Sequence, residues 1–400
     1  METTVIKKTV IVNHIVERYW EKIHDKIRLV EQPFDGFLGG NLGIVWYYYH
    51  LWKVTGVKEY SWKAKQMIEQ IFDNMNNEPK LIGASFGNGA AGFGYVVTYL
   101  TKEGFLDIDL DSELADLDEY LYQSALPWIE DDFIDYLHGA LGIVHYFSQR
   151  LPNPIVNGYL EDIINRILNK AIVDEKGWRL KGYLMKPEEK EEINFSLSHG
   201  MPAFLIIILN AHCKGLNIKG IQEIICNAVK YLLHHQIDVD LFEKKFSFFP
   251  FNVNEISGER FYGNRLAWCY GDLNVTLFLY RAAEFLKDES LKKKADLIGT
   301  FTMMRDTEES TLAKDSHFCH GSSGIAQLYY RLYKMTNIEA YKKGFDKWIE
   351  NTLVMIDKDL EIGTFNEKEG ELLEGWPGVA LTLQTYLSKE PITWDKAFLL

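Results

Sequence analysis

The chain has 400 residues, of which 47% are hydrophobic and 25% are charged. This composition is ordinary for a globular protein and excludes disorder, while the length suits either two or three domains or one large repeat architecture. Asp and Glu number 57 against 43 Lys and Arg, which gives a formal net charge of −14. Such an acidic surface repels phosphate, so nucleic acid is not an expected partner.

The N-terminal twenty residues contain neither a long apolar stretch nor a small-residue cleavage site, so we expect no signal peptide. The longest apolar run, from Met201 to Leu209, is far too short to cross a bilayer, so we expect no transmembrane segment. These features favour the cytoplasm. Four cysteines in 400 residues do not make a disulfide framework. In a reducing compartment each cysteine is core filler, a metal ligand or a nucleophile.

A short glycine motif recurs along the whole chain. It consists of a glycine, two further residues and usually a second glycine. The seven copies are Gly40–Gly43, Gly89–Gly92, Gly139–Gly142, Gly200–Ala203, Gly271–Asn274, Gly321–Gly324 and Gly375–Gly378. Their first glycines are separated by 49, 50, 61, 71, 50 and 54 residues. A period near 50 residues indicates a repeat architecture.

Each motif is followed by a segment that is apolar on nearly all sides, such as 43–54 and 203–211, which predicts a helix buried all round. The segments in between carry one apolar stripe and one charged face, which predicts amphipathic helices. These lie near 8–30, 58–77, 111–129, 158–174, 219–236, 288–305 and 338–357. Seven buried helices therefore alternate with seven amphipathic ones. Period-two alternation is scarce, so we expect no extensive sheet.

A single helix pair cannot bury its apolar face, so neighbouring pairs must stack into an open solenoid or a closed ring. The last copy, from Trp376 onward, is as apolar as the others and shows no polar cap. We therefore predict an all-α fold, an α/α toroid of seven helix pairs forming one domain over residues 1–400. The two longest intervals carry irregular insertions near 176–194 and 242–263. The second is aromatic and rich in turn residues, so it is expected to line or cover a site, with room for small hairpins.

The glycine motifs place seven loops at equivalent points, which in a toroid meet at one end of the barrel. Glycines there permit positive φ and a close backbone approach. Cys269 and Cys319 stand two residues before their glycines, one repeat interval of 50 residues apart, and His320 follows Cys319. Two thiolates and one imidazole, with a fourth position open to water, are typical of catalytic zinc. For Cys213 and Cys226 we predict the alternative, small buried hydrophobic residues.

Several of these motifs resemble one known family, the lanthionine synthetase C-like cyclases. The matching segments are Trp268–Gly271 (WCYG), Cys319–Gly321 (CHG), Ser198–Gly200 (SHG) and Gly375–Gly378 (GWPG). The resemblance implies a toroid of two concentric layers of seven helices. It also implies zinc-dependent addition of peptide cysteine thiols to dehydroalanine or dehydrobutyrine, which forms the thioether rings of lanthionine or methyllanthionine.

The resemblance also implies roles for single residues. The zinc ligands of the family correspond to Cys269, Cys319 and His320. His199 matches the catalytic histidine, and we expect it to protonate the enolate that follows thiol attack. Arg265 is expected to stabilise the negative charge of that enolate. Asp135 is expected to orient His199 or Arg265, and Tyr270 to hydrogen-bond a zinc-bound water.

Each of these four residues also has a purely structural interpretation. His199 would then be a core histidine with satisfied nitrogens, and Arg265 a surface or loop-anchoring residue. Asp135 would belong to a solvated face or a helix cap in the acidic stretch 130–135, and Tyr270 would only pack. The sequence does not assign roles to His138 or Glu374, each of which precedes a repeat glycine.

The expected partners are a dehydrated precursor peptide with leader and core, a separate dehydratase, and an exporter complex that the sequence leaves open. Attachment to the membrane through such a complex is also left open. One alternative is a family member that binds glutathione, adds it to dehydroamino acids, or binds a peptide without catalysis. Another is a different α/α toroid enzyme, but a hydrolase needs paired carboxylates that the loops do not offer. A structural zinc would need a fourth ligand, with His138 and His317 as the candidates.

Overall fold

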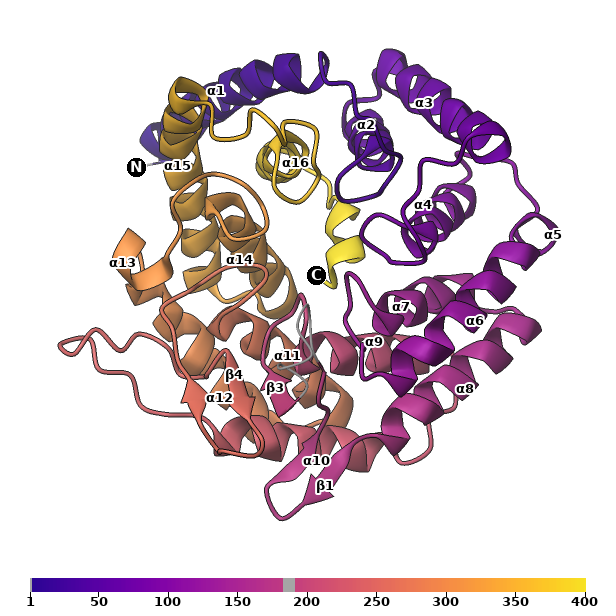
Figure 1. The fold of residues 1–400 in the computed structure, drawn as a ribbon. Helices are drawn as coiled ribbons and strands as arrows, with labels where there is room; N and C mark the ends of the chain where they lie inside the picture. The colour runs from indigo at the N-terminus through magenta and orange to yellow at the C-terminus, as the bar shows by residue number, and fades with distance from the viewer. Residues whose placement is uncertain (1, 183–190) are drawn as a thin grey trace. The chain divides into compact units, whose positions relative to one another are not determined.

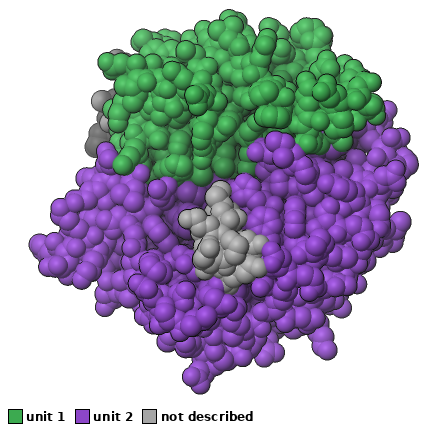
Figure 2. Space-filling view, in the orientation of Figure 1, with its two compact units in different colours: residues 1–81, 313–398, 400 green, residues 82–312, 399 purple. Residues whose placement is uncertain are grey.

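The computed structural model describes residues 2–182 and 191–400. Two compact units are distinguished in Figure 2. Unit 1 comprises residues 1–81, 313–398 and 400, and unit 2 comprises residues 82–312 and 399. The part of the first predicted insertion that spans residues 183–190 lies outside the described residues. The prediction of one domain over 1–400 stays a prediction.

Each repeat glycine is the N-cap of a helix, so the glycine motif locates seven helix starts correctly (Figure 1). In the described chain these helices are α2 (Asn41–Thr55), α4 (Ala90–Lys102), α7 (Ala140–Arg150), α9 (Met201–Cys213), α11 (Asp272–Leu286), α14 (Ser322–Thr336) and α16 (Trp376–Leu387). Their residues are buried on nearly every side, as the all-round apolar pattern predicts.

The seven predicted amphipathic helices are also present. They are α1 (Glu2–Ile27), α3 (Lys58–Asn77), α6 (Ala115–Glu130), α8 (Pro154–Asn169), α10 (Ile221–His234), α12 (Glu289–Phe301) and α15 (Glu339–Ile362). The predicted bounds are approximate, since α1 begins before the predicted residue 8 and α15 ends beyond the predicted residue 357, and the prediction of 158–174 for α8 is wrong at both ends. Asn153 begins the helix earlier, because its side chain accepts hydrogen bonds from the backbone N–H groups of Ile155 and Val156. Strand β1 begins at Ile172 and ends the helical segment sooner.

Short elements complete the described chain. The short helices are α5 (Leu110–Glu113), α13 (Glu308–Thr311), η2 (Thr302–Met304) and η3 (Trp394–Phe398). The strands are β1 (Ile172–Asp174), β2 (Gly177–Arg179), β3 (Glu192–Asn194), β4 (Asn252–Asn254) and β5 (Arg260–Phe261). β1 and β2 form an antiparallel hairpin. β3, β4 and β5 form an antiparallel sheet in which Ile193 pairs with Val253 and Val253 with Arg260. The small hairpin for which the second insertion has room is therefore present, formed by β4 and β5.

Within each unit the buried helices pack against one another and the amphipathic helices pack against them. In unit 1, α14 contacts α16 and α16 contacts α2, while α1 and α15 pack on α16 and α14. In unit 2, α4 contacts α7, α7 contacts α9 and α9 contacts α11. The amphipathic α6, α8, α10 and α12 lie against these helices. Among the described residues, no helix combines the length and the apolar character that crossing a membrane requires.

The glycine that starts each buried helix lies against backbone from the loop just before it. A Cβ at Gly139 would lie 2.4 Å from the carbonyl oxygen of Phe133, six residues earlier, and 2.7 Å from the amide nitrogen of Asp135. The same clash recurs at the other six N-cap glycines. Positive φ, however, is needed only at Gly271, where φ is 127°. The glycines are therefore required for close approach rather than for a left-handed backbone.

The first prediction concerns this close approach. Gly139→Ala should lower the free energy of unfolding by about 1–3 kcal/mol, because the surrounding atoms are backbone and must shift. Gly158→Ala is the matched control, since Gly158 is exposed on α8 and a Cβ there meets no atom within 4 Å. That control should raise the stability by about 0.5–1 kcal/mol. Urea denaturation measures both, and wild-type stability in Gly139→Ala would contradict the argument.

The second prediction concerns His145, which is enclosed by aromatic rings in unit 2. The imidazole stacks on Tyr95 with a centroid separation of 4.9 Å and meets Phe86 and Tyr136 edge-on. Neither ring nitrogen has a hydrogen-bond partner in the described structure, and burial lowers the pKa of His145 to about 3. Between pH 6.5 and 3, His145 is therefore protonated in the unfolded chain and neutral in the folded chain. The free energy of unfolding consequently decreases as the pH falls through this window.

His145→Phe removes this proton difference while keeping a ring of similar size. We expect the slope of the unfolding free energy against pH, between pH 6 and 4, to decrease by about 1.4 kcal/mol per pH unit. Denaturant titrations at several pH values measure the slope. An unchanged slope would show that His145 is protonated in the folded protein.

Candidate active site

Four of the seven loops before the buried helices share one hydrogen bond. The side chain four residues before the repeat glycine accepts from the backbone N–H of the residue just before that glycine. The pairs are Ser85 with Asn88 at 3.4 Å, Asp135 with His138 at 2.6 Å, Ser196 with His199 at 2.9 Å, and His317 with His320 at 3.3 Å. This bond fixes the backbone from which His199 and His320 project.

Asp135 does more than its counterparts, because it bridges two loops. Its Oδ1 accepts the His138 backbone N–H, and its Oδ2 lies 2.6 Å from Nδ1 of His199. The carboxylate is buried, and the imidazole is 12% exposed. The structure thus brings Asp135 to His199, and it excludes the interpretation of Asp135 as part of a solvated face. Such a bond selects the ring tautomer and holds the ring orientation.

The ring of His138 lies parallel to that of His199, with centroids 6.0 Å apart and an interplanar angle of 14°. Burial lowers the pKa of His138, and the neighbouring His199 lowers it further, while Asp135 opposes the shift. The imidazole of His138 is therefore uncharged at neutral pH and lies parallel to one face of the His199 ring. The sequence signal for this role is only its place before a repeat glycine.

Tyr270 lies beside the other residues of this cluster. Its ring centroid is 6.2 Å from that of His199, and its hydroxyl accepts a hydrogen bond of 2.8 Å from Nδ2 of Asn194. Burial raises the pKa of Tyr270, although the Asn194 hydrogen bond works against this. The phenol therefore keeps its proton at neutral pH. Asn194 is a site residue that the sequence reasoning missed.

Asn274 explains why one motif lacks its second glycine. Its Nδ2 donates to the carbonyl oxygens of Ala267 and Trp268, at 3.2 and 2.9 Å, and its Oδ1 accepts from the backbone N–H of Leu197. The carbonyl of Cys269 accepts from the N–H of the same Leu197 at 3.1 Å. One buried amide thus joins the Cys269 loop to the loop that carries His199. The departure from glycine was the available signal.

A buried ion pair stabilises the chain on either side of the Cys269 loop. Arg305 donates to Asp272, the first residue of α11, at 2.7 Å, and both side chains are at most 1% exposed. Arg305 also donates to the carbonyl of Asn264, and Asp272 accepts from the N–H groups of Phe248 and Phe249. The pair therefore ties the second insertion to the start of α11.

Arg265 is half-buried six residues before Gly271, and its carbonyl oxygen is the atom that a Cβ at Gly271 would strike. No described hydrogen bond or ion pair joins its guanidinium to Asp135 or His199. The structure therefore assigns Asp135 to His199, and a role for Arg265 in catalysis stays a prediction.

Cys319 and His320 lie in the loop before α14, in unit 1. Asp359, buried near the end of α15, accepts from the backbone N–H and the hydroxyl of Ser316 at 2.8 and 2.6 Å. The backbone N–H of Cys319 donates to the carbonyl of Leu373. These bonds hold both ends of the loop, so the two side chains have a fixed base.

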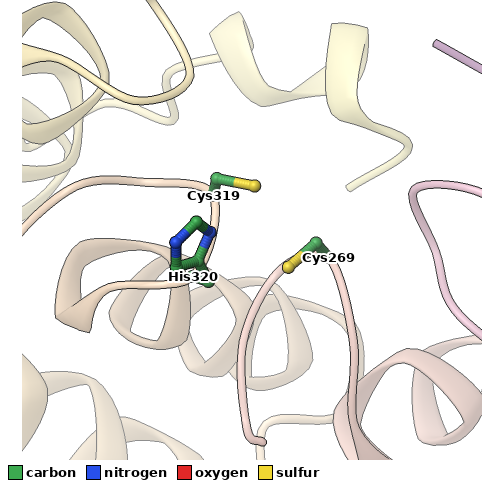
Figure 3. A group of neighbouring side chains, drawn as sticks. All are labelled: Cys269, Cys319 and His320. Carbon is green, nitrogen blue, oxygen red and sulfur yellow. The ribbon is translucent and has the colours of Figure 1, made fainter. Parts of the chain in front are cut away.

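The ligand atoms of Cys269, Cys319 and His320 all lie within 4.8 Å of one another (Figure 3). A tetrahedral zinc ion with Zn–S bonds of about 2.3 Å and Zn–N bonds of about 2.0 Å spaces its ligand atoms by roughly 3.5–3.8 Å. The three residues therefore fit zinc in donor chemistry, and their ligand atoms lie close enough together to converge on one ion. The group contains only these three, so neither His138 nor His317 joins it as a fourth ligand among the described residues.

His317 is engaged elsewhere. Its Nδ1 accepts the His320 backbone N–H, and its Nε2 lies 3.4 Å from Oδ1 of Asp315. The prediction that Cys213 and Cys226 are buried is wrong, because both are exposed. The buried stripe of α10 contains Ile221, Ile225 and Val229, and Cys226 falls outside that stripe.

Glu374 pairs with Lys368 in unit 1. Burial alone would raise the pKa of Glu374, but the hydrogen bond and charge of Lys368 outweigh it and lower the pKa. Glu374 is therefore an ion-paired carboxylate at neutral pH.

A pocket adjoins His199 within unit 2. It is lined by Ile134, Leu180, Lys181, Gly182, Asn194, His199, Gly200, Met201 and Phe204. The pocket gives a ligand direct access to the imidazole that Asp135 orients.

The profile of one protein family, described as "Lanthionine synthetase C-like protein", matches residues 37–399. Among solved structures, "Nisin cyclase" matches with a TM-score of 0.73 and 20% sequence identity over 97% of this chain and 97% of that chain. This likeness shows the fold and confirms the predicted class, an all-α toroid of helix pairs.

A cellobiose 2-epimerase from Bacillus thermoamylovorans is 12% identical over 72% of this chain and 88% of that chain. Its TM-score of 0.44 is too low to carry an argument. No curated protein matches the chain. The family resemblance expected from the WCYG, CHG and SHG segments is thus confirmed by a match over most of the sequence, and the chain belongs to the lanthionine synthetase C-like family.

Proposed function

We propose that the chain is a zinc-dependent lanthipeptide cyclase, which adds cysteine thiols of a peptide to dehydroalanine or dehydrobutyrine and so forms thioether rings. The observation that carries the proposal is the Cys269, Cys319 and His320 group, whose ligand atoms lie within 4.8 Å of one another. Family membership supports the same reaction. Zinc held by these residues would lower the pKa of an incoming thiol from its ordinary value of about 8.5.

His199 is the proposed acid in this reaction. The thiol gives up its proton and its sulfur bonds to the β-carbon, the π electrons move toward the carbonyl, and the α-carbon then takes up a proton. Asp135 binds Nδ1 of His199, so Nε2 is the nitrogen proposed to deliver that proton. A buried carboxylate stabilises the protonated imidazole before transfer and holds the ring during it.

Arg265 is proposed to stabilise the enolate, and Tyr270 is proposed to hydrogen-bond a water at the metal site. A guanidinium is permanently charged and suits an oxygen that gains negative charge. The phenol of Tyr270 is a neutral donor whose ring orientation is held by Asn194. Both residues flank Cys269 in sequence, so movement of this loop would displace them together.

The proposed substrate is a precursor peptide, with leader and core, that a separate dehydratase has already modified. An exporter complex is a further proposed partner. The proposed location is the cytoplasm, with attachment to the membrane only through such a complex.

The third prediction tests the metal and the reaction together. The purified protein should hold about one zinc ion per chain. Cys269→Ala should lose the metal and the cyclisation, whereas Cys226→Ala, which changes an exposed thiol of α10, should keep both. Elemental analysis measures zinc, and alkylation of a dehydrated cysteine peptide before and after incubation counts the thiols consumed, because the addition leaves the mass unchanged. Full zinc and full activity in Cys269→Ala would refute the proposal.

The fourth prediction concerns the Asp135–His199 pair. Asp135→Asn keeps an oxygen for the His138 N–H but loses the charge that binds Nδ1 of His199. The cyclisation rate should fall by on the order of 10²–10⁴ while the zinc content stays at the wild-type level. Asp131→Asn, four residues earlier and exposed, is the control and should retain the rate. A rate within a few-fold of wild type in Asp135→Asn would remove His199 as the acid.

A further inference from the structure

We propose that the pocket beside His199 is a specificity subsite, which holds the apolar side chain of the substrate residue next to the dehydroamino acid. This inference rests on the proposed function and names a feature of its substrate. The pocket lies beside the proposed proton donor. His199 and Gly200 form part of the pocket wall, and His199 is the proposed proton donor to the α-carbon. Consecutive Cα atoms are 3.8 Å apart, so a neighbouring side chain reaches this pocket when the α-carbon faces His199.

Several side chains in the wall of the pocket are apolar. Ile134, Leu180, Met201 and Phe204 line the pocket and are each at most 7% exposed. Phe204 stacks on Trp178 with a centroid separation of 5.6 Å and an interplanar angle of 9°. This backing ring keeps the wall in one position. The apolar part of this wall gains free energy when an apolar side chain displaces water from it.

Two polar side chains of the pocket, Lys181 and Asn194, already have partners. Lys181 pairs with Glu191 at 2.7 Å. Asn194 donates to Tyr270 and accepts from the backbone N–H of Ser196, both at 2.8 Å. A polar or charged substrate side chain would lose water there without gaining an equivalent hydrogen bond. The pocket therefore selects apolar side chains and rejects charged ones.

The chain offers a position at which the pocket can be narrowed. Gly182 lines it, its φ lies outside the left-handed region, and a Cβ there would meet only the carbonyl oxygen of Asp132 at 3.6 Å, an ordinary contact. Gly182→Leu therefore narrows the pocket by adding a large side chain, and it does so without backbone strain. Gly158→Leu adds the same side chain at an exposed glycine of α8 and serves as the control.

The fifth prediction compares four dehydroalanine peptides that differ only in the residue beside the dehydroalanine, which is Ala, Leu, Phe or Asp. Each peptide is made with Cys for turnover and with Ser in place of Cys for binding by calorimetry. In the wild type the Leu peptide should bind at least about tenfold more tightly than the Ala peptide, and the Asp peptide should bind least. Gly182→Leu should abolish the Leu advantage and leave the Ala peptide within about twofold, whereas Gly158→Leu should preserve it.

Two failures are distinguishable in this experiment. If the Cys peptides lose thiols but the neighbouring residue changes neither binding nor KM, the subsite is wrong and the proposed function stands. If no peptide loses thiols, the proposed function fails. The Ser peptides still decide the subsite in that case, because equal affinities across the series overturn it and a Leu preference removed by Gly182→Leu supports it.

Discussion

The architecture depends on one steric constraint, the contact between the glycine that starts each buried helix and the backbone of the loop just before it. At Gly139 a methyl group would lie 2.4 Å from the Phe133 carbonyl, so only a hydrogen atom fits. This contact folds each loop back on its helix and leaves the residues just before the glycine at the helix entrance. The residues proposed to bind metal and to move protons, His199, His320 and their neighbours, occupy those few positions. The constraint that shapes the fold thus also decides where chemistry can be placed.

In the candidate site, residues that stabilise these loops through hydrogen bonds also contact the proposed catalytic side chains. The residue four before the glycine accepts one backbone hydrogen bond in several repeats, and a serine suffices at 85 and 196. Asp135 makes the same bond with one oxygen and binds His199 with the other. Asn274 replaces a repeat glycine and joins two loops through one amide. The repeat supplies positions, and single substitutions within it supply function.

Much of the fold could be predicted, because glycine spacing and apolar periodicity are local signals. They located the buried helices and most of the amphipathic ones. The ends of α8 were missed, since the Asn153 cap and the following hairpin compete with the apolar stripe. The exposure of Cys226 was misjudged, although its place outside the Ile221–Ile225–Val229 stripe was visible. Asp135 and His199 are 64 residues apart, and only the family resemblance connected them. Asn194 and the ion pair of Asp272 with Arg305 gave no sequence signal, because their partners are brought together by tertiary packing alone.

The exposure of Cys213 and Cys226 has a practical consequence for the protein as a chemical reagent. Thiolates at a surface react with oxidants and with each other, whereas buried ones are protected. Cys269 and Cys319 are both at most 9% exposed. Air oxidation would therefore cross-link separate molecules through α9 and α10 before it reached the inner sulfurs. Cross-linking through the exposed cysteines and oxidation of Cys269 and Cys319 are thus separate forms of damage. A reductant that prevents the cross-linking gives no information about the state of the two buried cysteines.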